Sequence, residues 1–256
     1  MADARADSPP DPAAPGTARP AYYAARPGGW RDWWTLLHPP YTAWHLAYVV
    51  VGACLAPRVS LSALLATLIA FFLAVGLGAH ALDELNGRPL QTQISSPALI
   101  AVTVVSLAGA VALGAVGISR AGWGLLPFMI IGPVLVVAYN AELFHGLLHT
   151  DLGFAAAWGA FPVLVAYTAQ TGRLAIGPVV AAAAALALSA AQRSLSTPAR
   201  LLRRKTALVK GEITLADGQV TAIDRAALLA PLERALRAMS WAIVLLAAAM
   251  ALARLT

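Results

Sequence analysis

Seven long apolar segments constrain the fold of this chain more than any other feature of its sequence. Each is about 17–22 residues long, which as a helix is enough to cross about 30 Å of hydrocarbon. They are rich in Ala, Gly, Val and Leu, and small residues let helices pack closely in a membrane. The sequence therefore predicts an all-α, polytopic transmembrane helix bundle of about seven spans. The segments are 41–57, 61–82, 97–118, 123–140, 153–170, 174–192 and 236–254.

The composition excludes most soluble classes of protein. Of the 256 residues, 59% are hydrophobic and 12% are charged, about half the charged share that is usual in a soluble domain. A soluble protein of this size has too little interior to bury so much apolar surface. Although the net charge is +6, we therefore expect a membrane lipid, and no nucleic acid, as the partner of the basic residues.

The segments outside the spans predict the domain organisation. Residues 1–28 are rich in Ala and Pro and read as a disordered tail. Residues 29–40 contain three tryptophans and read as an interfacial amphipathic segment. The transmembrane domain then covers 41–256 and includes a cytoplasmic loop at 193–235. Within that loop we expect a small hairpin around Asp217-Gly218 and a second interfacial helix.

The basic residues predict the orientation of the bundle. Fourteen of the 18 lie on the same side as the N-terminus, and the other four, Arg58, Arg120, Arg173 and Arg254, lie on the opposite side. Because basic loops stay on the cytoplasmic side, the N-terminus is expected to be cytoplasmic. The twelve acidic residues and five histidines fall on that side too. We therefore expect an integral protein of a bacterial-type plasma membrane with its active face toward the cytoplasm.

Two groups of polar residues follow the ends of predicted spans. His80, Asp83 and Glu84 follow the second span and would share a helix face if the helix continues to about residue 85. The fourth span ends at Tyr139-Asn140 and is followed by a second group, whose i, i+3, i+7 spacing would also give one face. The members of this second group are Glu142, His145 and His149.

The first group and its surroundings resemble the UbiA superfamily of intramembrane prenyltransferases. The family carries an N-D-x-x-D-x-x-x-D motif where its second span ends, followed by R-P-L. This chain has Asp83 within His80–Gly87, followed by Arg88-Pro89-Leu90, and it has the family's tyrosine at Tyr139. It departs from the family at His80 and Gly87, which replace aspartates, and it lacks the second Asp-rich motif after the sixth span. The resemblance covers roughly residues 25–210.

The resemblance implies Mg²⁺-assisted transfer of an isoprenoid group from a diphosphate donor to a small or lipid hydrophobic acceptor. Asp83 and Glu84 would hold Mg²⁺, which neutralises the leaving diphosphate. His80 and Tyr139 join them as candidate catalytic residues. A basic run could bind phosphate in place of the missing motif, or simply anchor the loop at the inner membrane surface. The candidate substrate-binding residues are Asn86, Arg88, Asn140, Glu142, His145, His149, Arg200, Arg203, Arg204 and Lys205.

Two other functions fit the same residues. Glu142-x-x-His145 has the spacing used in di-iron bundles, so the histidines and carboxylates would form an iron or zinc centre of a membrane metalloenzyme. Alternatively, the missing second motif would leave a catalytically degenerate family member that only binds a lipid.

Overall fold

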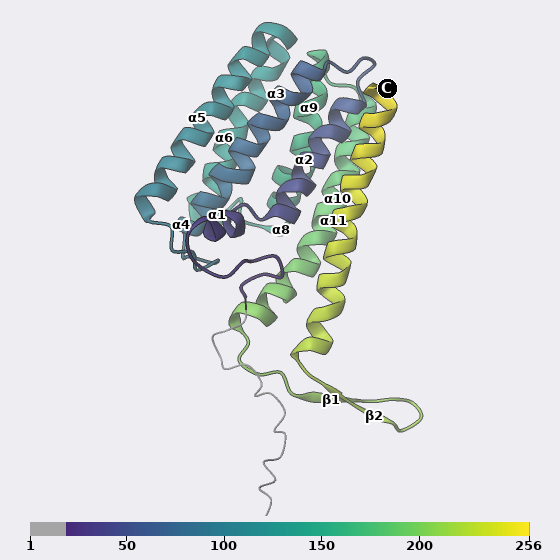
Figure 1. The fold of residues 1–256 in the computed structure, drawn as a ribbon. Coiled ribbons are helices and arrows are strands. Elements are labelled where there is room, and N and C mark those ends of the chain that lie inside the picture. The colour runs from purple at the N-terminus through teal and green to yellow at the C-terminus, as the bar shows by residue number, and fades with distance from the viewer. Residues whose placement is uncertain (1–18, 256) are drawn as a thin grey trace, which may run out of the picture.

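The computed structural model describes residues 19–255, which form a bundle of long, roughly aligned helices (Figure 1). The expected tail at 1–28 lies mostly outside the described residues. A short two-stranded hairpin and several π-helical or 3-10 segments, labelled η, complete the structure. The elements are α1 (Trp30–Leu36), α2 (Pro39–Cys54), α3 (Leu61–Phe71), η1 (Phe72–Ala79), α4 (His80–Leu85), α5 (Ser96–Ala121), η2 (Trp123–Leu125), α6 (Leu126–Asn140), α7 (Leu143–Gly146), α8 (Asp151–Ala155), η3 (Ala156–Ala160), α9 (Phe161–Thr171), α10 (Ile176–Arg200), η4 (Leu201–Lys205), β1 (Gly211–Thr214), β2 (Val220–Ile223) and α11 (Arg225–Leu255).

The predicted all-α polytopic bundle is confirmed. Six continuous helical stretches in the described part are long and apolar enough to cross a membrane, so the chain is an integral membrane protein. The remaining predicted span, 41–57, corresponds to α2, which has 16 residues, or about 24 Å of helix, and is the shortest of the seven. The six stretches are Leu61–Leu85, Ser96–Ala121, Trp123–Asn140, Asp151–Thr171, Ile176–Lys205 and Arg225–Leu255.

Helix α2 lies at the centre of the bundle, and its burial explains how so short a helix is held. Trp44 and Tyr48 are buried against Val163 of α9 and Ile243 of α11. Its other side contributes Val49 to the core that α3, η1 and α6 share. Pro39 and Pro40 occupy its first turn, where a missing backbone N–H costs nothing.

The two ends of the bundle differ in chemistry. One end carries α1, α4 and the hairpin, and we call it the α1 end (lower in Figure 1). The opposite end carries the loop at 55–60, the loop at 172–175 and the end of α11. Arg58, Arg120, Arg173 and Arg254 belong to that opposite end, as the topology predicts.

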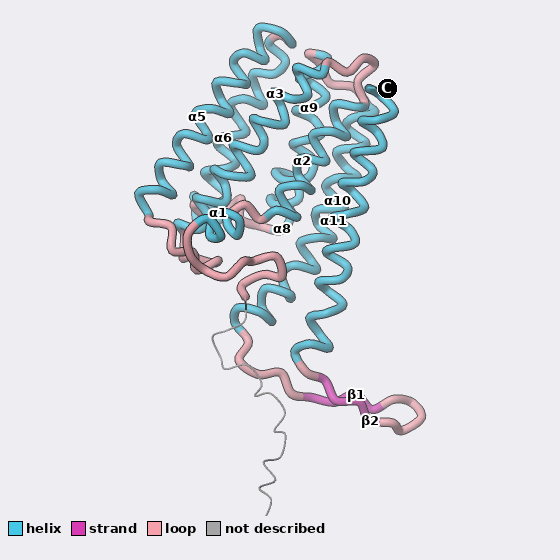
Figure 2. Tube along the Cα trace, in the orientation of Figure 1, coloured by secondary structure: helices cyan, strands magenta, loops and turns pink. Residues whose placement is uncertain are grey.

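The segment after residue 192 differs from the prediction in two ways. It was expected to leave the helix at 193, but α10 and η4 continue to Lys205. The second interfacial helix and the last span are instead one continuous helix, α11. The expected hairpin is present, with β1 antiparallel to β2 and Gly218 at a positive φ of 86° in its turn (Figure 2).

Candidate functional site

A polar chamber of about 260 Å³ opens among the helices at the α1 end. Its walls come from α2, the end of η1 with α4, the end of α6, α8 with η3, the last turns of α10 with η4, and α11. The N-terminal segment at 20–23 lies over it. The ends of the second and fourth predicted spans therefore meet at one cavity.

Eight of the fourteen predicted site residues line this chamber. Asp83 and His80 enter it from α4, because positions three apart share a helix face. Six of the predicted residues do not line it: Glu84, Asn86, Arg88, Glu142, His145 and Lys205. The eight that do are His80, Asp83, Tyr139, Asn140, His149, Arg200, Arg203 and Arg204.

Glu84 faces away from the chamber, contrary to the expectation that it shares a face with Asp83. Its side chain is fully buried. One carboxylate oxygen accepts from the backbone N–H of Leu90 at 2.9 Å, and the other accepts from the backbone N–H and hydroxyl of Thr92 at 2.8 and 2.9 Å. Adjacent positions on a helix lie about 100° apart, and here Asp83 lines the chamber while Glu84 points into the loop. Glu84 is an anchor for the loop at 86–95.

Asn86 and Arg88 also stabilise the loop at 86–95, and neither lines the chamber. Arg88 donates to the carbonyl of Ile94 at 2.5 Å and to the hydroxyl of Ser96 at 2.8 Å. Asn86 donates to the carbonyl of Asn140 at 3.2 Å and so joins the ends of α4 and α6. The R-P-L segment that carries the resemblance therefore shapes the loop in this chain.

The expected helical face of Glu142, His145 and His149 is not formed. Helix α6 ends at Asn140, and Glu142, Phe144 and His145 have φ values of 50°, 57° and 57°. Such left-handed backbone turns successive side chains in different directions, and Glu142 and His145 are exposed. Only His149 returns to the chamber, where its ring stacks on Tyr139 with centroids 4.5 Å apart.

Arginines on one face of α10 and η4 dominate the electrostatics of the chamber. Arg193, Arg200, Arg203 and Arg204 line it, against the two carboxylates of Asp83 and Glu233. Arg203 forms a bidentate ion pair with Glu233. Because Arg200 and Arg204 form no ion pair with any carboxylate of the described residues, they give the chamber an excess of positive charge.

The N-terminal segment covers the chamber and uses these arginines. Arg204 donates to the carbonyl of Pro20 at 3.0 Å, and the Tyr23 hydroxyl lies 2.5 Å from His38 Nδ1. Burial, with a smaller contribution from His80, lowers the pKa of His38 well below its usual value, so its ring is neutral at pH 7. Burial likewise raises the pKa of Tyr23 well above its usual value. The N-terminal segment at 20–23 and His38 therefore add polar groups but no charge to the chamber.

Several lining residues were not among the predicted site residues. His45, His38 and Tyr23 line the chamber with Gln192 and Arg193. Nothing in the sequence singled out His45 as a site residue, because it is a single histidine within an apolar span. Gln192 and Arg193 were not selected because the sixth span was expected to end at residue 192. Arg193 extends over the ring of Phe154, 5.3 Å from its centre, and pairs with Asp151 at 2.8 Å.

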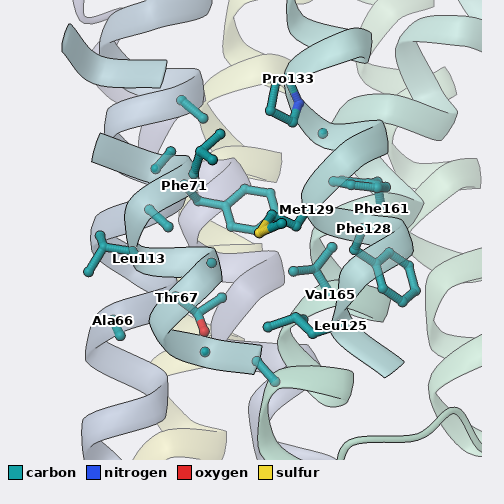
Figure 3. Close-up of a pocket in the computed structure, with 18 of the residues that line it drawn as sticks. Ala66, Thr67, Phe71, Leu113, Leu125, Phe128, Met129, Pro133, Phe161 and Val165 are labelled. Carbon is teal, nitrogen blue, oxygen red and sulfur yellow. The ribbon is translucent and has the colours of Figure 1, made fainter. Parts of the chain in front are cut away.

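An apolar cavity of about 270 Å³ adjoins the chamber (Figure 3). It lies between α3, α5, α6 and α9, and Phe71, Met129 and Phe161 are among its large side chains. Val75 and Trp158 line both spaces, so they form a common wall. The exposed Val116 on α5 also lines the apolar cavity, which therefore reaches the outer surface of the bundle.

The side chains of the chamber do not assemble a metal centre. Within residues 19–255, no group of three His, Cys, Asp or Glu side chains lies close enough together to hold a metal ion. The predicted magnesium pair is divided, since Glu84 is fully occupied by three hydrogen bonds. Of the two carboxylates in the chamber, that of Glu233 is paired with Arg203. The described residues therefore form neither the expected Asp83–Glu84 pair for Mg²⁺ nor a cluster of three ligands for iron or zinc.

Buried polar atoms without a hydrogen-bond partner among the described residues occur in the chamber wall and also elsewhere in the bundle. The hydroxyl of Tyr139 and Oε1 of Gln192 belong to residues that are 5% and 3% exposed, and neither has a hydrogen-bond partner among residues 19–255. Buried polar atoms are costly unless they form hydrogen bonds.

Comparisons of the chain with protein-family models, with curated proteins and with solved structures find no match.

Proposed function

We propose that this chain is a UbiA-like membrane prenyltransferase. It binds an isoprenoid diphosphate with the diphosphate in the polar chamber and the chain in the apolar cavity, and it moves the isoprenoid group to a small or lipid acceptor. The observation that carries the proposal is the shared wall of Val75 and Trp158. A ligand with a polyanionic head and a greasy tail matches two such adjoining spaces.

The unpaired arginines supply the electrostatics of the reaction. In prenyl transfer the allylic C1–O bond breaks, the electron pair leaves with the diphosphate, and the acceptor forms a bond to C1. The charge that builds up on the leaving group is stabilised by Arg200 and Arg204, whose planar N–H groups suit phosphate oxygens. No step is assigned to Mg²⁺, because its expected ligands diverge.

The charge bias of the sequence supports a cytoplasmic orientation for this site. We assign the α1 end to the cytoplasmic face, since it carries most of the basic residues. An isoprenoid diphosphate is a charged metabolite that reaches the chamber from the aqueous side, and its tail lies in the apolar cavity.

The central experiment measures binding and turnover together. Purified protein in lipid nanodiscs should bind farnesyl diphosphate with EDTA present, and should release diphosphate in native lipid extract as a prenylated product forms. Binding without turnover would favour the degenerate, lipid-binding alternative, which the single unpaired carboxylate of the chamber also suggests. No binding would refute the proposal.

Asp83 offers a test of the metal question. Its carboxylate lines the same chamber as Arg200 and Arg204, so without a metal it repels a bound diphosphate. Asp83→Asn should therefore tighten binding of farnesyl diphosphate in EDTA by about fivefold, the equivalent of about 1 kcal/mol of like-charge repulsion. Glu142→Gln, outside the chamber, is the control. Weaker binding by Asp83→Asn, seen only with Mg²⁺ present, would show a metal bridge instead.

The apolar cavity should set the chain length of the donor. Ala66 lines it about 13 Å along the helix from Val75, toward the end away from the chamber. Ala66→Phe fills that part, so turnover of geranylgeranyl diphosphate should fall by about tenfold more than turnover of geranyl diphosphate. Ala115→Phe, on the exposed side of α5, serves as the control. Equal losses for both donors would place the chain elsewhere.

A further inference from the structure

Three of the four histidines that line the chamber share one arrangement, whereas His38 has its Nδ1 at the Tyr23 hydroxyl. Nδ1 of His45, His80 and His149 lies 2.9, 3.2 and 3.0 Å from the backbone carbonyls of Trp158, Gly76 and Tyr139, respectively. A carbonyl only accepts hydrogen bonds, so Nδ1 of each ring must carry the hydrogen. In a neutral ring this leaves Nε2 with its lone pair. Each of the three rings, when neutral, therefore presents Nε2 to the chamber as a fixed acceptor.

These acceptors do not suit the diphosphate itself. Phosphate oxygens also accept hydrogen bonds, so lone pairs of neutral histidines would repel them. The arginines lie on α10 and η4, whereas His45 and His80 lie on α2 and α4. The chamber thus has a donor side for an anion and an acceptor side for a group that carries O–H or N–H.

His45 lies beside the wall between the two cavities. It is 5% exposed, and its ring centre lies 6.3 Å from that of Trp158, the residue that walls both cavities. When the diphosphate lies in the chamber and the tail in the apolar cavity, the carbon that joins them passes this wall. His45, whose Nδ1 also lies 2.9 Å from the Trp158 carbonyl, is therefore an imidazole held beside this junction.

We propose that the acceptor substrate is a hydroxyl compound and that His45 is the catalytic base that takes its proton. This rests on the proposed prenyl transfer. The acceptor oxygen forms a bond to C1 as the C1–O bond to diphosphate breaks, the electron pair leaves with the diphosphate, and the hydroxyl proton moves to His45 Nε2. The carbonyl of Trp158 holds the resulting imidazolium through Nδ1–H. Gln192 Oε1, buried without a partner among the described residues, can accept a second hydroxyl of the same acceptor.

Water, the smallest hydroxyl acceptor, provides the test. Protein in nanodiscs is given radiolabelled farnesyl diphosphate in H₂¹⁸O, and farnesol is measured. Attack at C1 places ¹⁸O in farnesol, whereas attack at phosphorus places it in phosphate. His45→Asn keeps a side-chain N–H for the Trp158 carbonyl but lacks the base, so farnesol release should fall by about 100-fold or more while donor affinity changes less than about threefold. His145→Asn, exposed and outside the chamber, should match the parent protein.

The outcomes separate the inference from the proposed function. If farnesyl diphosphate does not bind, or if ¹⁸O appears in phosphate, prenyl transfer itself is refuted. If labelled farnesol forms at the same rate with His45→Asn, prenyl transfer stands and the role of His45 is overturned. Loss of donor binding by His45→Asn, with a parent-like melting temperature, would make His45 a binding residue and would also overturn its role as the base.

Discussion

Replacing Arg200 and Arg204 together with glutamine should weaken the binding of farnesyl diphosphate by on the order of 100-fold or more. Both guanidinium groups line the chamber and pair with no carboxylate of the described residues. A hydrogen bond to a charged partner contributes about 1.5–3 kcal/mol, so the loss of two such groups costs at least two orders of magnitude in affinity. Glutamine keeps much of the side-chain length and some hydrogen bonding, so the charge is the main change.

The neighbouring basic residue gives a matched control for this experiment. Lys205 belongs to the same run of sequence, but it is exposed and does not line the chamber. Lys205→Gln should leave the dissociation constant, measured in nanodiscs of neutral lipid, within about twofold of that of the parent protein. If Lys205→Gln weakens binding as much as the double variant does, the run acts as a diffuse anchor at an anionic surface. The chamber would then lose its role as the diphosphate site.

The bundle followed from the sequence because apolar length alone decides what can span a membrane. The position of the chamber followed from charge, since polar groups that end two spans on one side must meet near the same membrane surface. His80 and Asp83 illustrate this, because a helix that continued past the apolar run brings both to one cavity. Glu84 shows what this spacing argument does not predict, since the residue next to Asp83 binds the loop at 86–95 and does not line the chamber.

The arginine face of α10 was present in the sequence but was concealed by its composition. An Ala-rich span is weakly hydrophobic, so the sixth span was predicted to end at residue 192, just before the basic region that begins with Arg193. Arg193, Arg200 and Arg204 are nevertheless spaced by seven and four residues, which is the spacing of one helix face. The irregular backbone at 142–145 gave no such sign, because none of its left-handed residues, Glu142, Phe144 and His145, is glycine.

Glu84→Ala should destabilise the protein by about 3–5 kcal/mol, a larger effect on folding than that of any other variant discussed above. The substitution leaves two backbone N–H groups and the Thr92 hydroxyl without their acceptor at a fully buried site. The loop at 86–95 then keeps the hydrogen bonds of Asn86 and Arg88 and that of Asp32, which accepts from the Gln93 backbone N–H at 2.8 Å. Thermal unfolding in detergent, followed by circular dichroism, measures the change.

The comparison with Asp83→Asn decides what Glu84 does. Asp83 is one residue away but faces the chamber, so Asp83→Asn should change donor binding and leave the melting temperature close to that of the parent protein. Glu84→Ala should do the reverse in any fraction that remains folded, apart from effects that the loop transmits through Pro89, which also lines the chamber. A Glu84→Ala protein of normal stability whose turnover lost its dependence on Mg²⁺ would instead make Glu84 a metal ligand. The fully buried carboxylate would then have to leave its three hydrogen bonds to reach the ion, which is why the structure favours the anchoring role.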